Sequence, residues 1–516
     1  MKMRVNIVDL FDSTVETKGS QIAIEHNDET ISFYELKNKA LSVATLLLKR
    51  NEALINRPIA VFLPKEINTV ISDLGVLYSG NAFMNLDVKM PVDRIRNILE
   101  KIKPITIITN KKYFELLKNI AIPMIDIESV EENIDYKLIN ERKKKQIDTD
   151  PMCIINTSGS TGTPKGVVLN HRSFFDFTDW ALETFSFDGS EVIGSLSPVV
   201  FDIYDFELCM LILKGSKLIL LDSSLAMFPA NLLKEIDNKK VNFIFWVPSI
   251  MVNIANLDLL KKILPINLKM IWFAGEVFPT KQFLYWYDHI QKATFVNLYG
   301  PIEITLDCTY HIIDERPMED EPLPIGKPCR NSDIIILNED NQQTLENVEG
   351  ELCVRGTSLA MGYYNDIEKT ATAFVQNPLN NSYPELIYKT GDIVSKDRNG
   401  IIHFKGRKDS LIKHMGYRIE LGEIEHMIVN ELKLVDYCCA VYDDANKKII
   451  LFYEKDEEIA PQIFRKSLMK FFPSYMLPSN FKRMDLLPRN TNGKIDRLQL
   501  KNNIKKETSY EKSTIN

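Results

Sequence analysis

Short apolar runs, rich in β-branched and aromatic residues, recur between residues 105 and 298, and stretches with helical periodicity separate several of them. The runs that we predict to be strands are Ile105–Thr109, Met152–Ile155, Lys217–Leu221, Asn242–Val247, Met270–Phe273 and Thr294–Leu298. Strands that alternate with helices predict a mostly parallel sheet covered by helices. Ligands of such sheets bind beyond the carboxyl ends of the strands, so functional residues are expected just after these runs.

A helix is predicted to begin directly after Ser32. Ser32 and Glu35 have the S-x-x-E spacing of a capping box, in which each side chain binds a backbone N–H of the other residue. Apolar residues then recur at helical intervals from Leu36 to Leu47. This pattern predicts an amphipathic helix near the N-terminus.

The pattern changes after residue 331. Strand-like pieces at Ser332–Leu337, Glu351–Arg355 and Ile401–Phe404, with turn signals such as Asn399-Gly400, predict a β-rich subdomain. From Asp409 onward the pattern is α+β. Its predicted elements are a helix near Glu423–Glu431, a strand at Lys448–Tyr453 and a helix near Ile463–Phe472. The fold class is therefore α/β, and we expect an N-terminal domain of residues 1–408, a C-terminal domain of 409–503 and a polar tail of 504–516.

The composition is that of an ordinary globular protein, with 45% hydrophobic and 26% charged residues among 516. A net charge of -7 argues against a general nucleic-acid or membrane-surface binder. Seven cysteines without a C-x-x-C pair do not form a disulfide framework and favour buried thiols in a reducing compartment. The N-terminus lacks a signal-peptide pattern and no apolar run spans a bilayer, so a cytoplasmic location is expected.

The most informative motif is the decapeptide TSGSTGTPKG, residues 157–166, which follows a predicted strand. Glycines let several backbone N–H groups turn toward one anion, and five hydroxyl side chains and a lysine add donors and charge. The motif is not a Walker A loop, because Pro164 takes the place of the second glycine and Gly166 follows Lys165. A flexible surface linker would not need the Pro-Lys-Gly ending. The predicted phosphate-binding residues are Thr157, Ser158, Gly159, Ser160, Thr161, Gly162, Thr163 and Lys165.

This decapeptide resembles the phosphate loop of the adenylate-forming superfamily, which contains acyl-CoA synthetases, luciferases and the adenylation domains of non-ribosomal peptide synthesis. The resemblance extends from Ile31–Leu36 to Asn492–Arg497. It is strongest to stand-alone amino-acid adenylation enzymes and D-alanine–carrier-protein ligases. It implies a large N-terminal domain of helix-flanked sheets plus a β-rich subdomain, a small mobile C-terminal α+β domain, and ATP and Mg²⁺ as cofactors.

Further motifs carry the expected nucleotide site. The stretch 297–303, NLYGPIE, is similar to the superfamily's YGPTE motif, in which Tyr299 stacks on adenine and Glu303 binds Mg²⁺; Ile302 departs from the usual Thr. The stretch 388–392, YKTGD, is similar to the ribose-binding motif, and a carboxylate such as Asp392 can accept hydrogen bonds from two vicinal hydroxyls. The residues expected at adenine and ribose are Ala274, Gly275, Glu276, Asn297, Leu298, Tyr299, Gly300, Asp392 and Arg407.

The resemblance also implies roles in the C-terminal domain. Asp409 matches a hinge aspartate, although Leu411 departs from the family pattern there. Gly416 matches the loop presented when the thioester forms. Lys494, in Asn492-Gly493-Lys494, matches the catalytic lysine. A lysine suits this task because both reactants are anions, and the charge at the α-phosphate must be neutralised.

The Phe201-Asp202 pair resembles the motif of amino-acid-activating domains, in which the aspartate pairs with the substrate ammonium. Residue-by-residue matching gives a pocket of Asp202, Ile203, Phe206, Trp246, Trp272, Ala274, Leu298, Leu306 and Asp307. Three large aromatics indicate a small side chain, and Asp307 can accept a hydroxyl hydrogen bond, point to solvent or meet a second amine. We expect L-serine first, then alanine or D-alanine.

The expected acceptor is the phosphopantetheine thiol of a separate carrier protein acting in trans, since no Gly-Gly pair of a typical fused carrier domain occurs. We therefore predict a ligase that forms an aminoacyl-AMP and then a thioester. Two alternatives stay open: an acyl-CoA ligase for a small carboxylic acid, and a non-catalytic nucleotide-binding protein.

Overall fold

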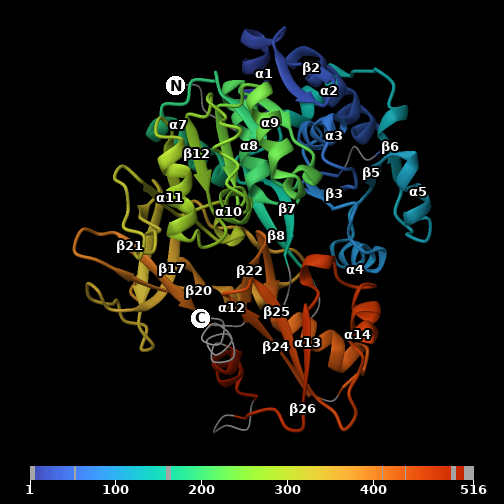
Figure 1. Ribbon diagram of the computed structural model, residues 1–516. Helices are drawn as coiled ribbons and strands as arrows, with labels where there is room; N and C mark the ends of the chain where they lie inside the picture. Colours follow the sequence, from blue (N-terminus) through green and yellow to red (C-terminus); the bar gives the residue numbers. More distant parts are fainter. Residues whose placement is uncertain are drawn as a thin grey trace. The chain divides into compact units, whose positions relative to one another are not determined.

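The computed structural model describes residues 6–50, 54–157, 164–408, 411–435, 437–489 and 495–504. The chain forms two compact units (Figure 1). Unit 1 contains the described residues of 1–88, 102–155 and 166–408. Unit 2 contains those of 89–101, 156–165 and 409–516. The domain boundaries expected at residues 408 and 503 stay a prediction.

The helix predicted to begin directly after Ser32 is present as α2. Ser32 and Glu35 form the capping box: Ser32 N–H donates to Glu35 Oε2 at 2.9 Å, and Glu35 N–H donates to Ser32 Oγ at 3.3 Å. The α-helices are α1 Ile7–Lys18, α2 Phe33–Arg50, α3 Ile67–Tyr78, α4 Val92–Ile102, α5 Lys111–Leu117, α6 Tyr136–Lys143, α7 His171–Phe185, α8 Asp202–Lys214, α9 Pro229–Asn238, α10 Pro248–Asn256, α11 Thr280–His289, α12 Ile367–Ala373, α13 Leu421–His426 and α14 Pro461–Leu468.

The largest sheet has nine strands, and its centre is parallel while both edges are antiparallel. In spatial order its strands are β15 Lys327–Pro328, β14 Thr309–Ile312, β13 Thr294–Tyr299, β12 Met270–Phe273, β11 Phe243–Trp246, β9 Val192–Ser195, β10 Lys217–Leu220, β1 Ile22–His26 and β2 Glu29–Ser32. Four of the strands predicted from apolar runs, β10 to β13, lie in this sheet. The predicted α/β class is confirmed.

A second sheet of seven strands holds the remaining two predicted runs, as β5 and β7. Its spatial order is β18 Gly362–Tyr363, β8 Lys165–Asn170, β7 Pro151–Thr157, β4 Ala82–Asn85, β3 Pro58–Val61, β5 Ile107–Thr109 and β6 Met124–Asp126. The strand β18 follows β8 by about 190 residues in the sequence, and the two strands pair antiparallel. Local sequence patterns do not predict such a pairing.

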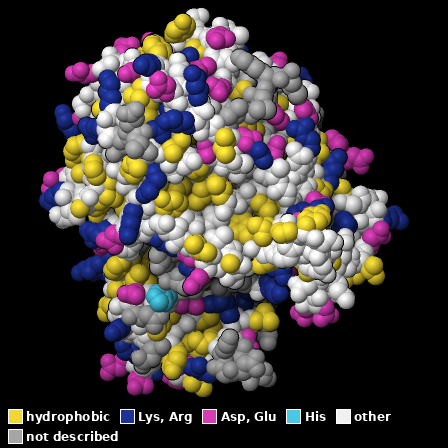
Figure 2. All heavy atoms as spheres, turned by 180° about the vertical axis from the view of Figure 1, so that it is seen from behind, with side chains coloured by type: hydrophobic (Ala, Val, Ile, Leu, Met, Phe, Trp, Pro, Cys, Tyr) yellow, Lys and Arg dark blue, Asp and Glu magenta, His cyan; other side chains and the backbone are white. Residues whose placement is uncertain are grey.

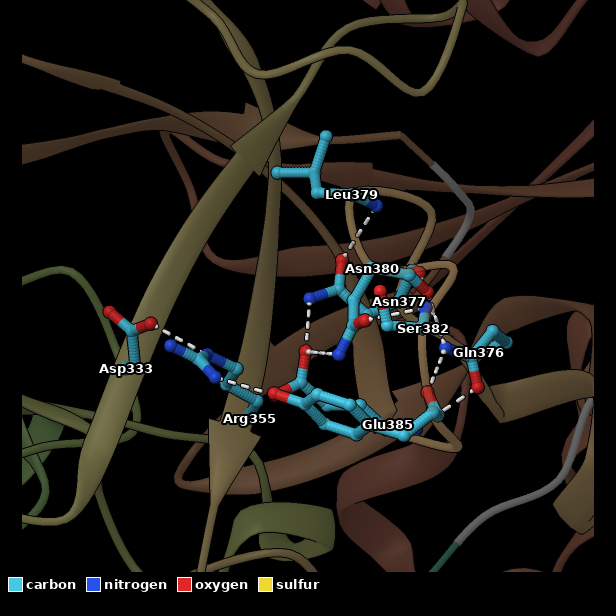
Figure 3. Close-up of polar contacts among 9 residues, drawn as sticks. Asp333, Arg355, Gln376, Asn377, Leu379, Asn380, Ser382 and Glu385 are labelled. Atoms are coloured by element: carbon cyan, nitrogen blue, oxygen red, sulfur yellow. Dashed lines mark hydrogen bonds and ion pairs between the residues drawn. The ribbon is translucent and has the colours of Figure 1, made fainter.

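The β-rich subdomain is an antiparallel sheet of β16 Ser332–Leu337, β17 Gly350–Gly356, β20 Leu386–Lys396, β19 Phe374–Gln376 and β21 Ile402–Arg407. Figure 3 shows a polar cluster on its surface. Arg355 on β17 binds Asp333 on β16 at 2.7 Å and Glu385 at 2.6 Å, and Glu385 also accepts from Asn377 Nδ2 at 2.6 Å. This cluster joins three segments of the subdomain.

Unit 2 has an α+β pattern, as predicted. Its strands are β22 Leu411–His414, β23 Tyr417–Glu420, β24 Tyr437–Asp443, β25 Lys448–Glu454 and β26 Asn480–Met484. The first two form a hairpin whose two-residue loop, Met415 and Gly416, has φ of +52° and +79°. Positive φ at both central residues is the mark of a type I′ turn, and glycine adopts it without steric cost.

The nine-stranded sheet separates two apolar cores, because successive side chains of a strand point to opposite faces. Phe243, Phe245 and Trp272 belong to one core. Ile244 and Trp246 belong to the other. This alternation decides which side chains of β11 and β12 can line a common pocket.

The remaining features are the surface charges, the cysteines and the apolar character of the helices. In the face shown by Figure 2, basic and acidic side chains are interspersed. All seven cysteines are free and buried, as expected. None of the helices in the described ranges combines the length and apolar character that a bilayer span requires.

Candidate active site

A carboxylate, a phenol and a guanidinium meet where three strands of unit 1 come together. Arg407 Nη1 on β21 donates to Oδ1 of Asp392 on β20 at 2.5 Å, and Arg407 Nη2 donates to the carbonyl of Thr390 at 3.1 Å. The hydroxyl of Tyr299, at the end of β13, donates to Oδ2 of Asp392. Burial and the adjacent Asp392 carboxylate raise the pKa of Tyr299 well above its usual range, so the phenol remains a donor.

The local backbone holds Asp392 in this position. Asp392 and Arg407 are direct cross-strand partners, and the register shifts just beyond them, between Ile393 and Val394. Thr390 Oγ1 accepts from the Asp392 N–H at 3.0 Å and donates to the Leu352 carbonyl at 2.7 Å. Bulges of this kind re-aim side chains at the end of a ladder.

The chain after β13 folds back sharply on itself. A Cβ on Gly300 would lie 2.2 Å from the carbonyl oxygen of Leu306 and 2.5 Å from Cα of Asp307, so only glycine fits there. Thr305 and Leu306 take positive φ values of +53° and +66°. This turn brings Leu306 and Asp307, which the sequence placed in the pocket, back against the end of the strand.

Glu303 lies in the same turn and is fully buried, with 0% exposure. Its Oε1 accepts from the hydroxyl of Tyr363 at 2.8 Å, and its carbonyl accepts from the Ala360 N–H at 2.9 Å. No group of three His, Cys, Asp or Glu residues able to hold a metal occurs among the residues described. A single buried carboxylate nevertheless fits Mg²⁺, which is commonly held by one or two carboxylates plus substrate phosphates.

A cluster of aromatic rings includes a residue one turn after Asp202, the first residue of α8. Phe206, one turn later, stacks on Trp272 at a ring distance of 5.3 Å and an angle of 15°. Phe245 meets the same indole edge-on at 5.5 Å. Ile203, Ala274, Leu298 and Leu306 belong to the same core. Phe206 and Trp272 are therefore in direct contact, and the assignment of the whole set to one substrate pocket stays a prediction.

Trp246 is the exception. It points to the opposite face of the sheet, into the second core, and its indole N–H donates to the Gly194 carbonyl at 3.0 Å. The strand alternation that turns Trp272 toward Phe206 turns Trp246 away. Phe245, its neighbour, occupies the face that the sequence analysis assigned to Trp246.

The other expected nucleotide residues have structural partners. Gly275 has a φ of +89°, and Glu276 accepts from the Ser249 N–H at 3.0 Å at the start of α10. Asn297 Nδ2 donates to the Pro324 carbonyl at 2.7 Å. These contacts shape the loops after β12 and β13, and they leave the assignment to adenine a prediction.

Of the phosphate motif, the structure describes Thr157 and the stretch 164–166; Thr157 and Lys165 belong to unit 2. Thr157 ends β7, and its buried Oγ1 has no hydrogen-bond partner among the described residues. Lys165 begins β8, with Nζ 3.7 Å from Glu420 Oε1. Outside the described residues lie Ser158, Gly159, Ser160, Thr161, Gly162, Thr163, Asp409 and Lys494.

Sequence reasoning missed Lys65, a half-buried lysine after β3. Its Nζ donates to the carbonyls of Ser195 at 2.5 Å and Ser197 at 2.8 Å, shortly before Asp202. Burial lowers the pKa of Lys65 to about 8 and raises that of nearby Glu207 to about 7. Lys65 joins the loop after β3 of the seven-stranded sheet to the end of β9 of the nine-stranded sheet, a contact that no local signal predicts, whereas strand alternation could have identified Phe245.

Comparison with known proteins decides the family. The model of the family described as AMP-binding enzyme matches residues 11–364. This chain belongs to the AMP-binding enzyme family. The predicted superfamily is thereby confirmed.

Relatives of this AMP-binding enzyme include two bacterial synthases. It is 30% identical to tyrocidine synthase 1 of Brevibacillus parabrevis over 96% of the chain, and spans 45% of that relative's length. It is 29% identical to zwittermicin A synthase ZmaJ of Bacillus cereus, covering 96% of the chain and 94% of that protein.

The fold agrees with solved structures. The adenylation domain AlmE of Vibrio cholerae, in complex with glycyl-adenosine-5'-phosphate, superposes with a TM-score of 0.85 at 20% identity, covering 98% of this chain and 99% of AlmE. The fused adenylation–PCP di-domain NpsA-ThdA of Klebsiella oxytoca gives a TM-score of 0.78 at 20% identity, covering 94% of this chain and 95% of that one. The AMP-binding enzyme thus has the architecture of adenylation domains.

Proposed function

We propose that this protein activates a small amino acid with ATP as an aminoacyl-AMP, releases pyrophosphate, and transfers the aminoacyl group to the phosphopantetheine thiol of a separate carrier protein. The observation that carries the proposal is Asp202, an acid at the start of α8 beside the Phe206–Trp272 stack. A carboxylate next to a small apolar pocket selects acids that carry an ammonium group. The family membership supports the use of ATP.

The first half-reaction joins a substrate carboxylate oxygen to the α-phosphorus, while the bond from that phosphorus to the β-phosphate oxygen breaks. Asp392 and Arg407 hold the ribose, and Tyr299 supports adenine and orients Asp392. Glu303 holds Mg²⁺, which neutralises phosphate charge when bound. Thr157, Lys165 and the residues between them hold the phosphates, and Lys494 neutralises the carboxylate–phosphate repulsion.

In the second half-reaction the thiol sulfur attacks the acyl carbon, and AMP leaves as the carbon–oxygen bond to phosphate breaks. The thiol proton goes to solvent. Gly416 lies at a hairpin tip in unit 2, where the absence of a side chain allows close approach of a pantetheine arm. NpsA-ThdA and PA1221 each contain an adenylation and a PCP domain, which supports a carrier protein as acceptor.

The aromatic group limits the substrate side chain. Phe206, Phe245 and Trp272 pack against each other, so the remaining space suits a small residue. A hydroxyl needs an acceptor and a donor: Asp307 supplies the first, and the buried Trp272 N–H, which lacks a hydrogen bond to any described residue, supplies the second. We propose L-serine first, then alanine or D-alanine, and add glycine because AlmE was solved with a glycyl adenylate.

We also propose a cytoplasmic location, in agreement with seven buried free thiols. A cytoplasmic enzyme would meet ATP and a carrier protein in the same compartment.

The decisive experiment is ATP–pyrophosphate exchange across the proteinogenic amino acids plus D-alanine and β-alanine. Exchange that depends on a small amino acid supports the proposal, and the largest rate is expected with L-serine. Activity only with an aliphatic acid plus CoA would identify an acyl-CoA ligase instead. Nucleotide binding without any exchange would identify a non-catalytic protein. Lys494→Ala should abolish exchange, and full activity of that variant would remove its catalytic role.

A further inference from the structure

A two-residue strand attaches the segment 360–364 to the strand that follows the phosphate motif. Tyr363 pairs with Val167 and Gly362 with Val168, in antiparallel register. The Met361 N–H donates to the Val168 carbonyl at 2.9 Å, and the Tyr364 N–H donates to the Gly166 carbonyl at 2.8 Å. The position of Tyr363 is therefore set by β8.

The same segment binds Glu303 twice. The Tyr363 hydroxyl donates to Oε1 at 2.8 Å, and the Ala360 N–H donates to the Glu303 carbonyl at 2.9 Å. The Tyr363 N–H is itself bound to Thr370 Oγ1 at 2.9 Å, and its ring packs edge-on against Phe374 at 6.1 Å. The phenol is thus fixed at its backbone, its ring and its hydroxyl.

We propose that Tyr363 is a positioning residue that fixes the orientation of the Glu303 carboxylate for Mg²⁺·ATP. Because Tyr363 is paired with β8, the geometry of the metal site then depends on the strand that follows the phosphate motif. This inference rests on the proposed function of Glu303 as the Mg²⁺ ligand. A carboxylate on a two-methylene side chain has several rotamers, and each unproductive rotamer weakens metal binding. A neutral phenol donor selects one orientation and leaves the carboxylate its charge.

The burial of Glu303 makes this donor important. At 0% exposure the carboxylate cannot regain hydrogen bonds from bulk water if the hydroxyl is removed. Loss of such an outer hydrogen bond typically costs about 10- to 100-fold in metal affinity or activity. A tyrosine with only a packing role would lower stability without changing the dependence on Mg²⁺.

The test compares Tyr363→Phe with Tyr364→Phe in the full-length protein. Both variants lose one phenol hydroxyl, and both residues lie on the segment paired to β8, but the Tyr364 hydroxyl has no hydrogen bond to any described residue. We expect Tyr363→Phe to raise the Mg²⁺ concentration for half-maximal ATP–pyrophosphate exchange by about 10-fold or more. Saturating Mg²⁺ should restore the rate, and Tyr364→Phe should match the wild type.

A second readout does not depend on the amino acid. The affinity for α,β-methylene-ATP is measured with and without Mg²⁺, and the ratio of the two affinities is compared between variants. Tyr363→Phe should lower this ratio, because only the affinity measured in the presence of Mg²⁺ falls. In a protein that already carries Glu303→Gln, the Tyr363→Phe substitution should have no further effect.

The outcomes separate the two hypotheses. Wild-type protein that binds the nucleotide with Mg²⁺ dependence but shows no exchange refutes the proposed function and leaves the binding readout to decide on Tyr363. An unchanged Mg²⁺ dependence in Tyr363→Phe overturns the inference. So does an equal loss of rate at all Mg²⁺ concentrations with a lower melting temperature, since that is the result of a packing defect.

Discussion

Arg407 faces Asp392 directly across β21 and β20, with Nη1 2.5 Å from Oδ1. The hydroxyl of Tyr299 reaches the other carboxylate oxygen from a different sheet. One carboxylate therefore connects the nine-stranded sheet with the β-rich subdomain. An acid that joins two sheets at the proposed ribose site couples nucleotide binding to the stability of unit 1.

The first prediction concerns this ion pair. Asp392→Asn should raise the KM for ATP by about 10-fold or more, because the loss of a charge-assisted contact costs roughly 1.5–3 kcal/mol. It should also lower the free energy of unfolding, since breaking a buried pair costs about 3–5 kcal/mol. Steady-state exchange and denaturant unfolding measure the two effects.

A matched control exists in the same subdomain. Asp333 and Arg355 are also direct cross-strand partners, at 2.7 Å, but their side chains are 54% and 41% exposed, against 4% and 14% for Asp392 and Arg407. Asp333→Asn should cost less than about 1 kcal/mol, as for other exposed pairs. Equal losses in the two variants would contradict a special role for Asp392.

The second prediction tests which aromatic of β11 lines the substrate pocket. Phe245→Ala should enlarge the pocket and shift the ratio of kcat/KM between valine and serine toward valine by about 10-fold or more. Trp246→Phe should leave that ratio unchanged, because its indole lies in the other core and binds Gly194. The Trp246→Phe substitution should lower only the melting temperature. If Trp246→Phe changes the ratio and Phe245→Ala does not, Trp246 lines the pocket and Phe245 does not.

The third prediction separates amino acids from simple acids. Asp202→Asn should lower the preference for serine over 3-hydroxypropanoate in the exchange assay by roughly 100-fold, about the worth of a charge-assisted contact. The KM for ATP serves as an internal control and should not change, since Asp202 is assigned to the proposed amino-acid pocket and not to the nucleotide site. Retention of the full preference would show that another group reads the ammonium.

The fourth prediction concerns pH and stability. Asp73 on α3 is buried, and its Oδ2 accepts from the Tyr204 hydroxyl at 2.7 Å and from Asn85 Nδ2 at 3.2 Å. Burial raises the pKa of Asp73 from 3.8 to about 7. The folded chain keeps a proton that the unfolded chain releases, so this stabilisation is complete below pH 3.8 and is lost as the pH rises to about 7.

Asp73→Asn should remove that decline, which amounts to roughly 4 kcal/mol at about 1.4 kcal/mol per pKa unit. The measurement is the difference in unfolding free energy between variant and wild type at pH 5 and pH 8. The wild-type curve alone does not suffice, because burial lowers the pKa of His171 to about 4 and produces the opposite slope from there to pH 6.5. An equal difference at both pH values would refute the prediction.

The local patterns predicted single elements well. Met270–Phe273 and Ser332–Leu337 are strands with the predicted bounds, and the capping box at Ser32 begins α2 directly after it. These features depend on side-chain alternation and on hydrogen bonds between near neighbours, which the sequence contains explicitly. The strand pairs β8–β18 and β20–β21 were not predicted, because pairing depends on which distant segments bury one another's faces.

The family, the order of the chemical motifs and the glycines at the turns could be predicted without a structure, because they depend on residue identity at short spacing. The tertiary structure was needed to show that Tyr363 meets Glu303, that Lys65 binds the carbonyl of Ser195, and that Phe245 instead of Trp246 faces Trp272. Such contacts join residues tens to hundreds of positions apart. They arise from the packing of whole sheets, which determines which face of each strand is turned toward which core.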